Sequence, residues 1–241
     1  YWPSTAVAGG RQLLPDLFQF GTNGYLLRSA SGEALIVDPY QGDQAKLQEL
    51  LASLPGIRPT AGVATHYHYD HCDLLPWLRD QYGARIWLHP IVAHPLREHQ
   101  RLALPWLPAA PILADQHWPN EGSWRWQEYE FQVAPWPGQT WGHCLFMATV
   151  NGVKVAFAGD SFQPPSRWNG TGGFCAYNRC RFSGFADSAQ RLQQWQPELL
   201  AAGHQTYCHY HAPRFNKIRR WAAAADRATR ALCPAADLAT H

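Results

Sequence analysis

Residues 65–73 read THYHYDHCD, so that three histidines and two aspartates fall within nine residues. His66, His68 and Asp70 alternate, and in extended backbone alternating side chains project to the same side. His71 follows where the chain must turn into a helix, and it can swing to a neighbouring position. One short segment can therefore supply ligands to two metal ions. Neutral imidazole and carboxylate suit zinc, and also iron or manganese.

Three further ligand-type side chains follow strands or turns elsewhere in the chain. Asp160 and His204 each come after an apolar strand, and His143 follows the Gly/Pro turn at 137–138. Strands that deliver a ligand at their carboxyl ends bring distant residues to one edge of a sheet, where sites in layered α/β folds are usually built. No cysteine occupies a ligand-like position, which argues against a closed structural zinc site.

The remaining histidines lack such neighbours. We interpret five of them as ordinary packed or solvent-facing side chains: His89, His94, His99, His117 and His241. His209 and His211 form a second His-x-His pair, but no other ligand-type residue accompanies it. Because this pair comes soon after His204, we expect that it could line a pocket rather than hold a metal.

Short strands and helices must position these side chains. Alternating or apolar runs bounded by turn residues predict strands at 17–20, 25–28, 34–37, 62–65, 85–88, 124–133 and 199–202. Residues 146–158 are typical of a hairpin that turns at Asn151-Gly152. Helices are predicted at 44–53, 186–195 and 214–232, and another is predicted to begin with Asp73 as its cap and Pro76 in its first turn. We find no repeat or composition break, so the pattern predicts one α/β domain over residues 1–241.

The composition limits the classes of function. The chain has 241 residues, 46% hydrophobic and only 16% charged, so a large core is expected and disorder is not. A net charge of +2 and three lysines argue against a nucleic-acid surface. The chain contains no run of 18 apolar residues, so no segment is predicted to span a membrane. We therefore expect a small-molecule substrate, and the sequence does not indicate an oligomeric state.

Six cysteines are too few, for this length, to indicate a disulfide scaffold. Cys175 and Cys180 could bridge a local loop, whereas the others are expected to be small buried side chains. The chain begins with Tyr1 rather than Met, so we expect it to be cut from a longer one. The compartment stays open, with the cytoplasm favoured.

Ordered motifs along the chain resemble the metallo-β-lactamase superfamily. The stretch from Thr65 to His71 matches that family's HxHxDH motif. Residues 137–143, PGQTWGH, resemble its PGHTxGH segment, with Gln139 in place of the first histidine. The segments FAGD at 157–160 and AGH at 202–204 are similar to its later elements, and NGYLL at 23–27 and ALIVDP at 34–39 are similar to its first strands.

This resemblance implies an αβ/βα sandwich in which two mixed sheets are flanked by helices and two metals, expected to be zinc, lie at one rim. It assigns one metal to His66, His68 and His143, and the second metal to Asp70, His71 and His204. Asp160 would bridge both. An aspartate at this position is similar to the glyoxalase II and lactonase branches rather than to zinc β-lactamases with a cysteine ligand there. Glyoxalase II itself is disfavoured, since its GCGRxFEG-like segment and its extended C-terminal domain are not found.

Such a site implies hydrolysis of an ester, thioester, lactone or amide. Two metals make hydroxide available at neutral pH, and Asp70 would orient it and later pass a proton to the leaving group. Two divalent cations outweigh the charge of two carboxylates and a hydroxide, so an anionic substrate is favoured. Two alternatives remain, a mononuclear iron sulfur dioxygenase and a metal-stabilised binding module without activity. Metal content separates the first of these from the zinc hydrolase.

Substrate choice is expected to depend on the loop at 161–182, which leaves directly from Asp160. It carries Trp168 and Tyr177, which could form apolar walls, and Arg179, which could bind a carboxylate. The alternative is that the arginines of this loop are only solvated.

Overall fold

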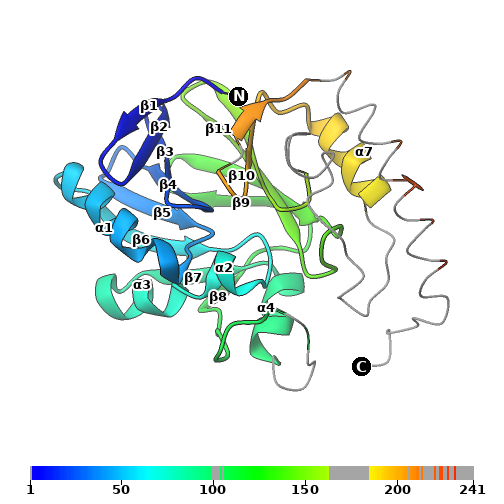
Figure 1. The fold of residues 1–241 in the computed structure, drawn as a ribbon, viewed down its shortest axis with the longest axis horizontal. Coiled ribbons are helices and arrows are strands. Elements are labelled where there is room, and N and C mark those ends of the chain that lie inside the picture. The colour runs from blue at the N-terminus through cyan, green and yellow to red at the C-terminus, as the bar shows by residue number, and fades with distance from the viewer. Residues whose placement is uncertain are drawn as a thin grey trace.

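Two β-sheets pack face to face and carry helices on their outer sides (Figure 1). The structure is a computed structural model. It describes residues 2–98, 104, 106–162, 185–205 and 207–211, with single positions at 213, 220, 223, 224, 227 and 231. The predicted loop from residue 163 onward and most of the helix predicted at 214–232 lie outside the described residues. The expected αβ/βα arrangement is confirmed.

The first sheet has eight strands that follow one another in chain order. They are β1 Thr5–Val7, β2 Gly10–Leu14, β3 Leu17–Phe20, β4 Gly24–Arg28, β5 Glu33–Val37, β6 Arg58–Val63, β7 Arg85–Leu88 and β8 Gln116–His117. Pairing is antiparallel from β1 to β5 and parallel from β5 to β8. The carboxyl ends of β5, β6 and β7 therefore lie at the same edge.

The second sheet has six strands in the order β14-β13-β12-β11-β10-β9. They are β9 Gly122–Trp126, β10 Tyr129–Pro135, β11 Cys144–Val150, β12 Val153–Gly159, β13 Leu199–Ala202 and β14 Tyr207–His209. Only β12 and β13 pair in parallel. The Asn151-Gly152 hairpin is confirmed, since Val150 pairs with Val153 and both turn residues have positive φ.

Helices cover the outer faces of both sheets. They are α1 Gln44–Ser53, which continues from a 3-10 turn at Gln41–Asp43, α2 Tyr69–Cys72, α3 Leu75–Tyr82, α4 Pro90–Arg97 and α7 Phe185–Trp195. In Figure 1, α1 and α3 lie beside the first sheet and α7 lies beside the second. Within the described ranges, no helix has the length and apolar character needed to cross a membrane.

Alternation along β12 shows how one strand contributes to two cores. Val155 and Phe157 belong to the cluster between the sheets, whereas Ala156 and Ala158 belong to a smaller cluster that includes Ala189 of α7. Successive side chains of a strand point to opposite faces, so both faces of β12 are covered. A strand buried on both faces is held rigidly, and β12 carries Asp160 directly after its end.

Three predicted elements differ in the structure. The strand predicted at 62–65 runs instead over β6 and ends at Val63, because the Thr65 N–H donates to Asp38 Oδ1 at 2.6 Å rather than to a neighbouring strand. The single strand predicted at 124–133 is the β9–β10 hairpin, in which Trp126 pairs with Tyr129. Asp73 does not cap α3; its Oδ1 accepts a hydrogen bond from the Gln41 backbone N–H at 2.6 Å.

Candidate metal centre

The ligand candidates meet where β6, β11, β12 and β13 reach one edge of the two sheets. Asp160 follows the last residue of β12, and His204 follows β13, its parallel neighbour, by two residues. His143 precedes β11, which is antiparallel to β12, so the start of β11 lies beside the end of β12. His66 and His143 form an isolated antiparallel bridge between the two sheets. The fold therefore brings together residues far apart in the chain.

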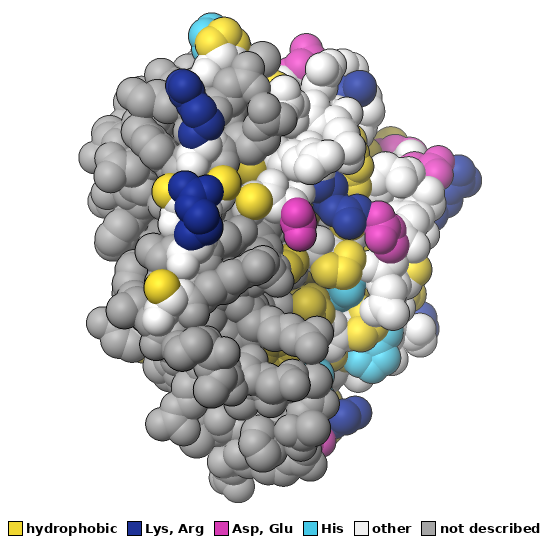
Figure 2. Space-filling model, turned by 90° about the vertical axis from the view of Figure 1, so that its right-hand side faces the viewer, with side chains coloured by type: hydrophobic (Ala, Val, Ile, Leu, Met, Phe, Trp, Pro, Cys, Tyr) yellow, Lys and Arg dark blue, Asp and Glu magenta, His cyan; other side chains and the backbone are white. Residues whose placement is uncertain are grey.

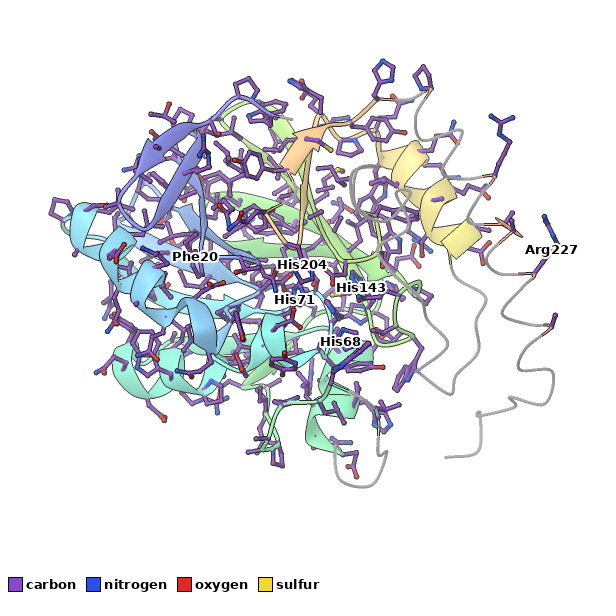
Figure 3. The ribbon with its side chains drawn as sticks, viewed as in Figure 1. Phe20, His68, His71, His143, His204 and Arg227 are labelled. Atoms are coloured by element: carbon purple, nitrogen blue, oxygen red, sulfur yellow. The ribbon has the colours of Figure 1, made fainter. Side chains whose placement is uncertain are left out.

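Three histidine rings pack around that of His66. Its ring centroid lies 4.6 Å from that of His68, 4.2 Å from that of His71 and 4.9 Å from that of His143, to which it is nearly parallel. All four side chains are buried. The labelled side chains of His68, His71, His143 and His204 lie close to one another in Figure 3. The HxHxDH segment and the later histidines thus form one cluster.

Two carboxylates join this cluster. Asp160 Oδ1 lies 3.4 Å from His71 Nε2, and Asp160 Oδ2 lies 2.9 Å from His204 Nε2. Asp70 Oδ2 lies 3.7 Å from His71 Nε2 and 3.8 Å from His204 Nε2. Among the described residues, two sets have ligand atoms within 4.8 Å of one another: His66, His71 and Asp160, and Asp70, His71 and His204. The second set is the trio expected to hold the second metal.

Buried nitrogen atoms without partners fit a metal at this place. The Nε2 atoms of His66, His68 and His143 are inaccessible to solvent and have no hydrogen-bond partner in the described part of the chain. A buried polar atom left unpaired costs about 1–3 kcal/mol, so three of them in one cluster call for an explanation. Zinc, iron and manganese accept imidazole nitrogen, and the nearby carboxylates complete a suitable set of donors.

The protonation states of the histidines suit ligand chemistry. Burial lowers the pKa of His66 well below its usual range, that of His68 to about 4 and that of His143 to about 3. Low polarity around these rings disfavours the imidazolium form. At neutral pH these three side chains are therefore neutral, which is the form that binds a metal.

His71 and Asp160 behave as an ion pair. Burial by itself lowers the pKa of His71, but the carboxylates of Asp160, Asp70 and Asp38 outweigh it and raise that pKa well above its usual value. Burial likewise opposes ionisation of Asp160, yet His71 and His204 bring its pKa well below the usual range. The carboxylates around His71 thus require a positive charge nearby. Here the protonated His71 ring supplies that charge, and a bound metal would supply it instead.

Asp38 orients two of the histidines, a role that the sequence analysis missed. Asp38 Oδ2 lies 3.0 Å from His71 Nδ1 and accepts the Thr65 hydroxyl at 2.7 Å. The Thr65 oxygen lies 3.1 Å from His66 Nδ1. A carboxylate on one ring nitrogen fixes the tautomer and turns the other nitrogen toward a metal. Asp38 directly follows β5 at the edge where His66 follows β6, so the strand-end rule could have found it.

Asn23 links the two residues nearest the opening of the site. Its Nδ2 donates to Asp70 Oδ2 at 3.1 Å and to the Asp70 carbonyl at 2.7 Å. Its Oδ1 accepts the backbone N–H of His204 at 2.7 Å. His204 has a φ of 55°, an unfavourable value for a residue with a side chain, and this hydrogen bond helps to hold it. In the sequence, Asn23 was noted only as part of a segment similar to the first strands of the family. No local pattern indicated its hydrogen bonds to Asp70 and His204.

Glycines let the backbone approach the cluster. A Cβ on Gly159 would lie 2.3 Å from Thr65 Oγ1 and 2.7 Å from His143 Nε2, and Gly159 also has a φ of 46°. A Cβ on Gly203 would lie 2.1 Å from Asp160 Oδ1. Both positions exclude larger residues, which explains why glycine precedes Asp160 and His204 in the sequence.

The cluster opens to solvent on one side. The side chains of Asp70 and His204 are 22% and 25% exposed, whereas the three histidines with unpartnered Nε2 atoms are buried. Two exposed aromatic residues stand beside it: Tyr69, and Trp106, whose ring centroid lies 5.2 Å from that of His68. The Trp106 carbonyl accepts the Tyr69 N–H at 2.8 Å. On the face shown in Figure 2, histidine side chains likewise lie among hydrophobic ones.

Several other residues named from the sequence are placed elsewhere. His209 packs on Trp2, with ring centroids 4.5 Å apart, and pairs with Leu199 at the start of β13. It cannot line the site, because β14 runs antiparallel to β13 and away from His204; that expectation was wrong. His89 caps α4 and its Nε2 lies 2.8 Å from the Asn120 carbonyl oxygen, as expected for an ordinary packed side chain.

Several residues named from the sequence lie outside the part of the chain that the structure describes. The residues expected to contact substrate lie outside the described residues: Trp168, Tyr177 and Arg179. The same holds for Cys175, Cys180, His99 and His241. Three described cysteines, Cys72, Cys144 and Cys208, are buried, as expected.

The fold is a four-layer α/β sandwich, and a cluster of histidine and aspartate side chains lies at one edge of it. Together these two features are those of a protein class that binds metals at this edge. The family model described as the metallo-beta-lactamase superfamily matches residues 17–204, and the chain belongs to this superfamily. No curated protein sequence matches the chain.

Solved structures share the fold. A metallo-beta-lactamase from Cronobacter sakazakii with a HARLDQ motif superposes with a TM-score of 0.67 at 16% identity, covering 92% of this chain and 93% of that one. A beta-lactamase from Chitinophaga pinensis gives 0.65 at 17%, covering 93% of each. The BLEG-1 B3 metallo-beta-lactamase gives 0.57 at 25%, covering 78% of this chain and 88% of that one.

Proposed function

We propose that the chain is a dinuclear zinc hydrolase that cleaves an ester, thioester, lactone or amide, closest in its ligand set to the glyoxalase II and lactonase branches. The observation that carries this proposal is the set of three buried Nε2 atoms without partners, on His66, His68 and His143. They lie beside a second group of donors formed by Asp70, His71 and His204. Asp160 lies within 4.8 Å of His66 in the first group and beside His71 and His204 in the second, which supports a shared ligand.

Each residue has a role in this proposal. His66, His68 and His143 would hold one zinc ion, Asp70, His71 and His204 would hold the other, and Asp160 would be shared by both. Zinc bound there would supply hydroxide at neutral pH and polarise the substrate carbonyl. The partly exposed Asp70 carboxylate reaches both the site and solvent, so it can orient the nucleophile and carry a proton to the leaving group. Gln139 Nε2 donates to Asp160 Oδ2 at 3.0 Å and helps to fix this carboxylate.

Substrate enters on the side of Asp70 and His204, because the other ligands are covered by protein. Trp106 and Tyr69 offer apolar surface at this opening. Tyr177, Arg179 and Trp168 follow Asp160 in the chain, and we propose that they contact the part of the substrate that does not react. An arginine there suits an anionic group.

The test combines metal analysis with a substrate panel. The purified chain would be loaded with zinc and assayed on a thioester, a lactone, a β-lactam and a phosphodiester. We expect zinc-dependent turnover of at least one of the three carbonyl substrates, abolished in His66→Ala and His143→Ala variants that still fold by circular dichroism. Turnover that depends on a single iron and on oxygen would support the sulfur dioxygenase instead. Zinc binding without turnover of any substrate would support a binding module.

A further inference from the structure

A cavity of about 350 Å³ lies at the end of the first sheet opposite the metal-ligand cluster. Its lining includes residues at the starts of β5, β6 and β7 and in the turn of the β9–β10 hairpin: Glu33, Arg58, Thr60, Arg85, Trp126 and Gln127. Because β5, β6 and β7 run parallel, their starts are separated from the metal edge by the length of a strand, roughly 17 Å for β6. The cavity is therefore a separate site, and its volume lies in the range of small-ligand pockets.

Indole rings form part of the cavity. Trp126 is only 7% exposed and belongs to the core between the sheets. Trp87 is partly buried, and its ring centroid lies 5.4 Å from that of Trp124, which holds it in place. Both are fixed by packing, so their surfaces inside the cavity can receive an aromatic or alicyclic group at little cost in side-chain entropy.

The charges around the cavity do not balance. Glu33 is already engaged, since its Oε2 accepts a hydrogen bond from Gln127 Nε2 and its Oε1 lies 4.0 Å from Arg58 Nη2. Arg85 has no ion pair or side-chain hydrogen bond with any residue that the structure describes. An arginine without a partner beside a cavity is a suitable site for a carboxylate, which it can bind through two parallel hydrogen bonds.

We propose that this cavity binds a small aromatic carboxylate, with the carboxylate on Arg85 and the ring against Trp87 and Trp126. The two indoles distinguish such a ligand from inorganic phosphate, which would leave their surfaces uncovered. Arg58 is held near Glu33, so Arg85 carries the specificity for negative charge. This site does not depend on the proposed hydrolase activity.

Titration calorimetry on the full chain tests the proposal, with 3-phenylpropionate as the probe and 3-phenylpropanol and inorganic phosphate as comparisons. We expect saturable binding of 3-phenylpropionate, at least 10-fold weaker binding of the alcohol, and no competition by phosphate. Arg85→Gln should weaken 3-phenylpropionate binding about 10-fold or more. Arg125→Gln is the matched control, because Arg125 lies in β9 but outside the cavity lining.

Several results would overturn the proposal. One is the absence of saturable binding; another is an Arg85→Gln variant that binds as well as Arg125→Gln. Phosphate binding as tight as that of 3-phenylpropionate would show that the indole rings do not contribute to recognition. Repeating the titration after zinc is removed with a chelator separates this site from the metal cluster. Unchanged affinity supports the cavity, and lost affinity would place the ligand on the metals instead.

Discussion

Asp38 Oδ2 lies 3.0 Å from His71 Nδ1, so a carboxylate from the first sheet fixes the ring of a proposed metal ligand. The same carboxylate accepts hydrogen bonds from both the backbone and the hydroxyl of Thr65, next to His66. Asp38 itself has a φ of 50°, which is unfavourable and must be held by these contacts. One residue therefore connects the orientation of ligands in both proposed metal groups.

Replacing Asp38 with asparagine should weaken zinc binding. The variant keeps an oxygen for the Thr65 N–H but loses the charge that orients His71, and losses of this kind reduce metal affinity about 10- to 100-fold. Competition with a chromogenic chelator measures the affinity. Asp16→Asn is the control, because Asp16 makes its ion pair with Arg28 away from the cluster. Equal affinities in the two variants would show that Asp38 does not orient the ligands.

Gly159→Ala should destabilise the chain more than Gly56→Ala. Both glycines have positive φ, and a side chain there costs about 1–2 kcal/mol. Around Gly56 there is no atom within 4 Å of an added Cβ, whereas at Gly159 the Cβ would overlap Thr65 and His143 and add about 1–3 kcal/mol. Urea unfolding with a chelator present measures both. Similar free energies of unfolding for the two variants would contradict the close approach.

The metal-free chain should lose stability as the pH falls below about 6.5. Burial lowers the pKa of His68 to about 4 and that of His143 to about 3, and it lowers that of His66 as well. Between these values and the usual 6.5, the unfolded chain binds more protons than the folded one, so unfolding becomes easier as pH decreases. The raised pKa of His71 and that of Asp73, which is raised to about 6, act in the opposite direction. They are two groups against four, because burial also lowers the pKa of His89.

Urea unfolding of the chelator-treated chain at pH 7, 6 and 5 checks this prediction. The free energy of unfolding should decrease over this range, and a His143→Gln variant should show a weaker decrease because one buried histidine is gone. A free energy that stays constant or rises from pH 7 to pH 5 would mean that these rings are not held neutral.

The loop residues proposed to contact substrate can be tested separately from the metals. Arg179→Ala and Tyr177→Ala should lower kcat/KM or change substrate preference while the zinc content stays that of the parent. Loss of a charged hydrogen bond to an anionic substrate costs roughly 1.5–3 kcal/mol, or about 10- to 150-fold in kcat/KM. If both variants keep parental kinetics on every accepted substrate, specificity must come from elsewhere, with Trp106 and Tyr69 as the next residues to change.

Much of the site could be predicted because its ligands obey one simple rule. His66, Asp160 and His204 follow strands, and parallel strands bring their carboxyl ends to one edge. Asp38 obeys the same rule but was not assigned a role, because a single aspartate after a strand has no ligand spacing of its own. Asn23 was beyond prediction, since its hydrogen bonds to Asp70 and His204 join segments 47 and 181 residues apart.

The fold was less predictable where local signals were weak. The β9–β10 turn uses Gln127 at a φ of 52° without glycine or asparagine, so it carries no turn signature. Another signal did exist. Trp124 and Trp126 are buried at alternate positions, but the next buried residue, Tyr129, comes three residues later. Two exposed residues therefore follow one another, which a continuous strand with one buried face does not allow.

Asp160→Ala should disturb both proposed metals, whereas His204→Ala should mainly empty one. Asp160 lies beside ligands of both groups, at 3.4 Å from His71 and within 4.8 Å of His66, while His204 lies beside the second group. Metal counts on the two purified variants measure this directly. An Asp160→Ala variant with full metal content would show that the carboxylate is not shared.

We propose that two metals are held by seven residues: His66, His68, Asp70, His71, His143, Asp160 and His204. Elemental analysis of the purified parent chain, after dialysis against limiting zinc, counts these metals. We predict two zinc ions per chain, with one retained more tightly than the other because its three histidines are buried. A single iron per chain, or no metal retained by a folded chain, would show that these residues do not form a dinuclear zinc site.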